Sequence, residues 1–268
     1  TNIIAPATEL ALIDAFGDGN LDVIFNYGPR TNNSIQSDTI FNHNYGAYIV
    51  RNYGAGSGAT TSDYAAVDYL KSVTDGAGNQ SQWHYRPLSS GADFYQTDHD
   101  YEGGGYLHFT SSMYAVQSFK QSNGIGGLND TEYAYAGAMY HMQGRGFTGF
   151  RTLTEKDVAR NIITTSTFEQ KFPRVSQLIT QTSQIGDITI ASLRNSWLDN
   201  PEHTIANIHH WYTSQSIQKQ FDLAGVALST QTVKFADIDD WGNIGKITTT
   251  IDALSTTIKE IDFAPSDL

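Results

Sequence analysis

The amino-acid sequence predicts an all-β protein made of antiparallel sheets of short strands joined by hairpins, with few short helices. Three observations favour this fold class. Apolar and polar residues alternate with a period of two in several runs, which is the spacing of a half-buried strand. Charged residues make up only 16% of the chain, against roughly 25% in an ordinary soluble domain, and Thr, Ser, Asn, Gln, Gly and Tyr replace them. The third observation is a repeated turn motif.

The alternating runs place the expected strands. Residues 22–27 put Val23, Phe25 and Tyr27 on one face of an extended chain. Residues 131–136 and 246–251 are rich in aromatic or β-branched side chains and are bounded by turn-forming residues. Two further segments are the candidates for helices: residues 62–72, with apolar residues at helical spacing, and residues 202–220, in which neither period fits well. Loops are expected at residues 27–37, 52–61 and 103–105.

The repeated turn motif is Asp-x-x-Gly, which occurs between strand-like runs at Asp75, Asp222 and Asp239. An Asp carboxylate accepts hydrogen bonds from the backbone N–H groups that follow it, and Gly adopts the positive φ that tight hairpins require. The motif therefore predicts hairpins near residues 76–77, 224–225 and 241–242.

Composition and charge exclude several functional classes. The net charge of −12 and the pI of about 4.9 argue against nucleic acid as a partner, since phosphate binding depends on clustered Lys and Arg. The chain has no Cys, which excludes disulfides, a thiolate nucleophile and thiolate metal sites. No apolar stretch approaches the ~18 residues that span a bilayer. Because the first residue is Thr1, we expect a processed form or a piece of a longer protein.

The common catalytic motifs are also missing from the sequence. It contains no Gly-x-Ser-x-Gly, His-Glu-x-x-His or Walker sequence, and its adjacent His209 and His210 do not form a metal pair by themselves. We therefore expect the chain not to be an enzyme.

Residues 144–151 are unusually rich in glycine. Small residues let the backbone pass close to another strand, so we expect a strand crossing anchored by the burial of Phe147 and Phe150. Arg145 and Arg151 are expected to pair with carboxylates or to stack on Tyr rings. A phosphate-binding loop is the alternative, but the strand-to-helix context and the Lys-Ser/Thr ending are missing.

Four segments in order carry a family resemblance: residues 123–127 (Asn-Gly-Ile-Gly-Gly), 133–135 (Tyr-Ala-Tyr), 143–151 (Gln-Gly-Arg-Gly-Phe-Thr-Gly-Phe-Arg) and 168–173 (Phe-Glu-Gln-Lys-Phe-Pro). They resemble the middle region of large bacterial Rhs/YD-repeat proteins, where a Salmonella-virulence-protein-B-like or insecticidal-toxin-complex B-component region precedes the YD repeats. With residues 72–85, the resemblance covers most of residues 10 to 173. The later turns at Asp222 and Asp239 resemble degenerate YD repeats.

The resemblance implies a long β ribbon that spirals into a hollow shell, often around a toxic C-terminal segment of the same or a partner chain. This chain is too short to close such a shell. We therefore expect a non-catalytic wall or scaffold section of an exported toxin or bacterial surface protein, with residues 1–40 as an FG-GAP-like segment and residues 41–268 as a Rhs/YD-like β region. Its expected partners are other segments of the larger protein or its toxin cargo.

The acidic run near the start has the spacing of a calcium loop, Asp-x-x-x-Asp-Gly-x-x-Asp, and resembles an FG-GAP blade. Asp14, Asp18 and Asp22 supply carboxylates, and Asn20 supplies a backbone carbonyl. Phe16 stands where a ligating Asp or Asn is usual, so calcium is expected to bind weakly. The alternative is an acidic β-turn in which the carboxylates accept hydrogen bonds from backbone amides.

A second acidic cluster contains Asp98, Asp100 and Glu102. In an extended chain these three share one face, and paired carboxylates are what glycoside hydrolysis requires. Catalytic pairs normally come from separate strands, however, and neighbouring like charges are usually a solvated loop. The shared face makes a glycosidase that uses Asp98, Asp100 and Glu102 the third function that we consider, and a solvated acidic loop is the alternative.

Abundant aromatic side chains beside polar residues favour a second function, a secreted module that binds a glycan or a protein. The alternative is cross-strand aromatic pairing, which any Tyr-rich sheet shows. The residues in question are Tyr45, Tyr48, Tyr53, Trp83, Tyr85, Phe94, Tyr95, Tyr101, Tyr106, Trp211 and Trp241.

Overall fold

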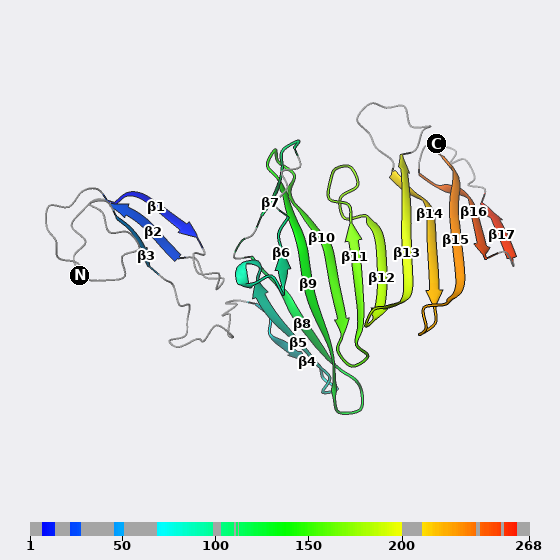
Figure 1. Cartoon of the computed structure of the whole chain (residues 1–268), viewed down its shortest axis with the longest axis horizontal. Helices are drawn as coiled ribbons and strands as arrows, with labels where there is room; N and C mark the ends of the chain where they lie inside the picture. Colours follow the sequence, from blue (N-terminus) through cyan, green and yellow to red (C-terminus); the bar gives the residue numbers. More distant parts are fainter. Residues whose placement is uncertain are drawn as a thin grey trace. The chain divides into compact units, whose positions relative to one another are not determined.

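A computed structural model describes residues 7–13, 22–27, 46–50, 69–98, 103–109, 111, 113–199, 211–239, 242–252 and 255–261. In these ranges the chain forms antiparallel strands and one short 3-10 helix, η1 (Leu88–Ser90) (Figure 1). The all-β prediction is confirmed. The chain divides into two compact units, Thr1–Gln96 with Thr110–Leu128, and Thr97–Phe109 with Asn129–Leu268. The predicted boundary at residue 40 lies outside the described residues.

The first unit contains two groups of paired strands. One is a three-stranded antiparallel sheet in the order β1-β2-β3, and the other joins β4 to β5 and β5 to β8. The predicted strand at residues 22–27 is confirmed as β2. The strands of this unit are β1 (Ala7–Ile13), β2 (Asp22–Tyr27), β3 (Gly46–Val50), β4 (Ser72–Thr74), β5 (Gln80–Pro87), β6 (Tyr95–Gln96) and β8 (Tyr114–Ser122).

The second unit is a meander in which each of the strands β9 to β17 pairs with the next one in sequence (Figure 1). The short β7 (Tyr106–His108) pairs with β9. The predicted strands at residues 131–136 and 246–251 lie in β9 and β16. The strands are β9 (Leu128–His141), β10 (Gly146–Asp157), β11 (Ile162–Phe168), β12 (Leu178–Ile185), β13 (Ile188–Asp199), β14 (Trp211–Phe221), β15 (Ala227–Ile238), β16 (Ile244–Ile251) and β17 (Ser255–Glu260).

The helix considered for residues 202–220 is wrong in its described part. From Trp211 onward this segment is β14, which pairs with β13 on one side and β15 on the other, for example through Ile217 opposite Arg194 and Thr232. From Gln215 to Gln220 the strand pairs on both sides, so its backbone groups have partners in two neighbouring strands, and this outweighs a weak local pattern. The other helix candidate, residues 62–72, is described only from Tyr69, where the chain is irregular and then enters β4.

The predicted Asp hairpins are confirmed. The Asp75 carboxylate accepts hydrogen bonds from the N–H groups of Ala77 (2.9 Å) and Asn79 (2.8 Å) between β4 and β5. Asp222 makes the same pair of bonds between β14 and β15, and Asp239 accepts from Asn243 between β15 and β16. The glycine of each motif has a positive φ of +80° to +86°. The local turn chemistry therefore sets the register of these strands.

A titration of Asp75 tests this turn chemistry. The side-chain hydrogen bond from Asn79 (2.9 Å), followed by bonds from the backbone, holds the pKa of Asp75 below its ordinary value of 3.8. The turn therefore contributes stability above pH 3.8 and loses it as the pH falls through the lowered pKa. We expect Asn79→Ala to raise the pKa of Asp75 toward 3.8, as followed by NMR of its carboxyl carbon. An unchanged titration in the variant would contradict the assignment.

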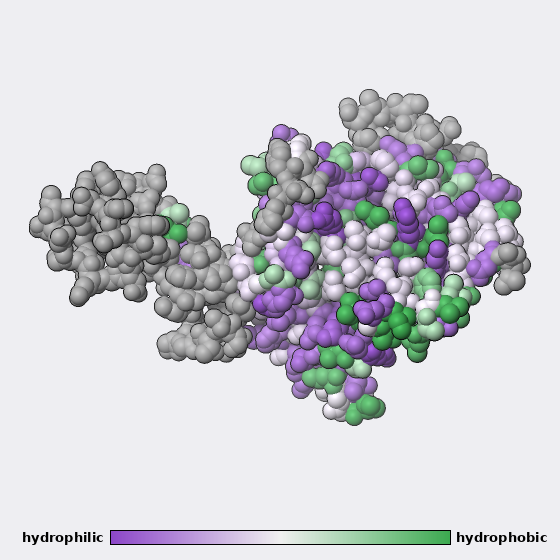
Figure 2. Space-filling model, viewed as in Figure 1, coloured by the Kyte–Doolittle hydropathy of each residue, from purple (hydrophilic) through white to green (hydrophobic). Residues whose placement is uncertain are grey.

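In the part of the chain that the structure describes, the sheet of the second unit is a single layer. Among the described residues of β10 to β17, only Thr148, Ser166 and Ile238 are buried, and most others are half-buried on both faces. Figure 2 shows mainly pale and hydrophilic residues over the middle of the sheet, with hydrophobic ones gathered at the turn ends of β13 to β15, where Leu223 and Leu228 are 69% and 62% exposed. A self-contained domain normally packs two layers around a core, and the described strands of this sheet differ from that arrangement.

Candidate functional site

A polar cluster of the second unit lies where β9 and β10 meet residues 169–177, the segment between β11 and β12. Two glycines break the regular pairing of β9 with β10. Gly137 has φ +65° and Gly149 has φ +92°, and the register shifts between Phe147 and Phe150. Glycine adopts these left-handed conformations without steric strain, so the strands bend here and turn backbone carbonyls away from the sheet.

Gln170 satisfies these carbonyls. The residue is only 3% exposed, and its side-chain amide donates hydrogen bonds to the carbonyl oxygens of Gly137 (2.6 Å) and Gly149 (2.8 Å). Buried backbone carbonyls require such partners. Gln170 therefore ties β9, β10 and the segment after β11 into one junction.

An ion pair lies against the same bend. Arg151 donates a hydrogen bond to Asp98, and both side chains lie within 4 Å of the place that a Cβ on Gly137 would take. Asp98 is thus a structural partner of a guanidinium. Asp100 and Glu102, the other members of the predicted acidic cluster, lie outside the described residues.

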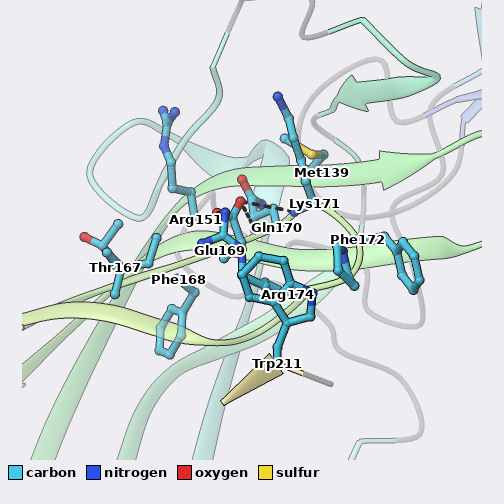
Figure 3. Close-up of a pocket in the computed structure, with 12 residues that line it drawn as sticks. Met139, Arg151, Thr167, Phe168, Glu169, Gln170, Lys171, Phe172, Arg174 and Trp211 are labelled. Atoms are coloured by element: carbon cyan, nitrogen blue, oxygen red, sulfur yellow. Dashed lines mark hydrogen bonds and ion pairs between the residues drawn. The ribbon is translucent and has the colours of Figure 1, made fainter. Parts of the chain in front are cut away.

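A cavity of about 520 Å³ opens beside the junction (Figure 3). Within it, Arg174 pairs with Glu169 (3.0 Å) and lies over the ring of Trp211, 4.8 Å from its centroid. These charged groups neutralise one another. The cavity is lined by Met139, Arg151, Thr167, Phe168, Glu169, Gln170, Lys171, Phe172, Pro173, Arg174, Ile179 and Trp211.

The predicted strand crossing at residues 144–151 is partly correct. Thr148 is buried and Phe150 packs against Tyr135 (4.6 Å), but Phe147 is 43% exposed and does not anchor the crossing by burial. Its ring packs instead edge-on against Phe150 at 5.5 Å. Arg145 stacks on a phenylalanine rather than on a tyrosine, at 3.6 Å from the ring centroid of Phe172.

Tyr135, whose ring packs against Phe150, is not suited to proton transfer at neutral pH. Its burial raises the pKa of the phenol strongly, and the nearby Tyr133 and Glu155 add to the shift. The hydroxyl therefore stays protonated, and the residue acts as a packing group.

The calcium loop remains a prediction. Asp14, Asp18 and Asn20 lie outside the described residues, whereas Asp22 is completely buried at the start of β2. Within the described ranges, no three His, Asp or Glu side chains are grouped closely enough to hold a metal ion.

Several of the aromatic residues pair with one another. In the first unit the ring centroid of Tyr69 lies 4.8 Å from that of Tyr85 and 5.5 Å from that of Tyr114. The ring centroid of Trp83 lies 5.3 Å from that of Phe119 on the neighbouring strand. Cross-strand pairs of this kind stabilise a sheet. Their rings thus have a structural role, which favours the alternative to ligand binding at these positions.

Fold and site together define a class, an antiparallel β-meander protein whose polar cluster is a structural junction. The chain belongs to a family, since the family model described as the insecticide toxin TcdB middle/N-terminal region matches residues 2–176. The resemblance to toxin-complex B components is thereby confirmed, whereas the FG-GAP-like motif stays a prediction. No curated protein matches the chain.

Two similar solved structures are crystal structures of TcdB2-TccC3 and of TcdB2-TccC3-Cdc42. Each has a TM-score of 0.55 and 10% sequence identity, with 97% and 96% of this chain covered. The chain spans only 15% and 14% of the chains that it matches. In the described part of the chain, no helix is long and apolar enough to cross a membrane.

Proposed function

We propose that this chain is a non-catalytic structural section of a toxin-complex B component, in which its sheet forms part of a wall that continues into neighbouring segments. The observation that carries the proposal is the single-layer meander of β9 to β17. A sheet with both faces half-exposed gains little from burial on its own. Further sections of a larger protein would supply the missing contacts.

The last strand supports this proposal. Every residue of β17 is exposed, and among the described residues β17 pairs only with β16. An unpaired edge exposes a row of backbone N–H and C=O groups that invites another strand. We propose that the next segment of the larger protein occupies this edge.

The comparisons support the choice of partners. Each of the two similar structures contains TcdB2 together with TccC3. By analogy, we propose that the protein containing this chain assembles with a C component and its toxin cargo, and that it acts outside the bacterial cell or on its surface. The pairing of Asp98 with Arg151 supports a role without catalysis, because that carboxylate already has a structural partner.

Cysteine labelling tests the wall. The chain has no cysteine, so single cysteines introduced at Thr232 and Val233 would report separately on the two faces of β15. In the assembled protein that contains this chain, we expect a bulky maleimide to label one variant rapidly and the other only after denaturation. A small maleimide on the denatured protein controls for reactivity. Equal labelling of both variants by the bulky reagent would contradict the proposal that this sheet is part of a wall with one enclosed face.

A further inference from the structure

One face of the second-unit sheet is lined by hydroxyl groups. Because directly paired residues point to the same side, the register aligns a row of side chains across eight strands. We name this side the threonine face. The row runs through Thr152, Thr167, Thr180, Arg194, Ile217, Thr232, Thr250 and Thr256.

The threonine face concentrates positive charge in an acidic protein. Five of the chain's 16 lysines and arginines lie on this side of β10 to β17, where Glu260 supplies the one carboxylate of these described strands. The neighbouring β9 adds two carboxylates on the same side, those of Asp130 and Glu132, next to Lys156. The opposite side carries Glu155 and Asp157 in β10. The five cations are Lys156, Arg194, Lys219, Lys234 and Lys246.

Three of these cations form an open group on adjacent strands. Arg194 in β13, Lys219 in β14 and Lys234 in β15 are all exposed, and strand geometry places their Cα atoms within about 15 Å of one another. No ion pair of the described residues includes any of them, whereas Lys156 pairs with Glu132 and Lys246 with Glu260. The three side chains therefore have their charges available to an external anion.

Their neighbours add hydrogen-bonding groups. Lys234 lies directly opposite Gln215 and Thr248, and Lys219 lies between Ser192 and Thr230. Hydroxyl and amide groups beside a cation suit a ligand that carries both acidic groups and hydroxyls.

We propose that this part of the threonine face binds an acidic oligosaccharide, whose carboxylate or sulfate groups pair with Arg194, Lys219 and Lys234 and whose hydroxyls bond to the Thr, Ser and Gln side chains. A peptide fits less well, because β13, β14 and β15 are internal strands with no free backbone edge for strand addition. Single-stranded nucleic acid needs aromatic stacking platforms, which these rows lack.

The test measures binding of the full chain to a heparin-derived oligosaccharide and to a hyaluronan oligosaccharide at low salt by calorimetry. We expect the Arg194→Gln, Lys219→Gln, Lys234→Gln triple variant to bind at least about tenfold more weakly to whichever saccharide the wild type binds. Heparin alone would indicate a sulfate ligand, and binding of both would indicate carboxylate recognition. Binding should fall as salt shortens the Debye length from ~10 Å at 0.1 M to ~3 Å at 1 M.

The matched control is the triple variant Lys71→Gln, Arg160→Gln, Lys259→Gln, which removes the same charges from exposed positions outside the threonine face. It should bind within about twofold of the wild type. The proposal is overturned if the wild type binds neither saccharide, if the control variant loses as much affinity, or if an acidic peptide or a single-stranded oligonucleotide of equal charge binds as tightly.

Discussion

Replacement of Gly137 by Ala is expected to lower the free energy of unfolding by about 2–5 kcal/mol. A left-handed backbone costs a non-glycine residue roughly 1–2 kcal/mol, and overpacking of a well-filled site costs roughly 1–3 kcal/mol more. Both apply here, because Gly137 has φ +65° and an added Cβ would lie 3.0 Å from Cβ of Arg151 and 2.7 Å from Oδ2 of Asp98. The Arg151 atom is attached directly to the backbone and cannot rotate away.

The matched control for Gly137 is Gly186→Ala. Gly186, in the turn between β12 and β13, has a similar φ of +57°, but no heavy atom lies within 4 Å of an added Cβ. We expect a loss of only about 1–2 kcal/mol, the backbone term alone. Urea denaturation followed by circular dichroism measures both variants. Equal losses would show that the junction around Gly137 is not tightly packed.

The steric argument does not extend to every glycine of the Gly-rich segment. The close passage of strands expected for residues 144–151 is not found at Gly146, where an added Cβ would meet only the ring of Tyr140, at 3.9 Å. Gly146 is costly to replace for a different reason, because its φ of +74° strains the backbone of any residue other than glycine. Spacing of glycines in a sequence does not distinguish these two constraints, because both depend on the folded backbone.

The fold was largely predictable because its signals are local. The Asp75, Asp222 and Asp239 turns depend on side chains within four residues of the backbone groups that they bind. The turn after β8 does not match the Asp-x-x-Gly motif because Asn123 stands in the place of Asp. Its side-chain oxygen nevertheless accepts the same hydrogen bonds, from the N–H groups of Ile125 and Gly127. Asn-x-x-Gly therefore predicts the same turn as Asp-x-x-Gly.

The junction was not predictable, because its contacts join positions far apart in the chain. Arg151 bonds to Asp98 across 53 residues, and Gln170 reaches Gly137 across 33. A lone Gln in a loop carries no sequence signal, and the segment containing it stood out only by family resemblance. The charged side of the sheet was equally hidden, because Arg194, Lys219 and Lys234 share a face only in the observed register.

Replacement of Gln170 by Leu is the second large effect expected, a loss of about 2–6 kcal/mol in the free energy of unfolding. Leu keeps the apolar volume but removes the amide that donates to the carbonyls of Gly137 and Gly149. Each buried acceptor left without a partner costs roughly 1–3 kcal/mol. Gln184→Leu is the control, since its amide makes one long bond of 3.4 Å to Thr189 in a half-exposed position. That variant should change stability by less than about 0.5 kcal/mol.

Replacement of Gln170 by Glu adds a pH test of the same contact. A carboxylate facing two carbonyl oxygens in a buried site is destabilised, so the pKa of the new Glu in the folded state should rise above the value of about 4.3 that it has in the unfolded chain. The unfolded state then releases its proton first, and the stability of the variant relative to wild type should fall as the pH rises from about 4 toward neutrality. When protonated, Glu can still donate to one of the two carbonyls, which would restore part of the loss in acid. Denaturation curves of wild type and variant across this range measure the difference. A pH-independent difference would mean that residue 170 is solvated in solution and that its amide does not hold β9 and β10 together.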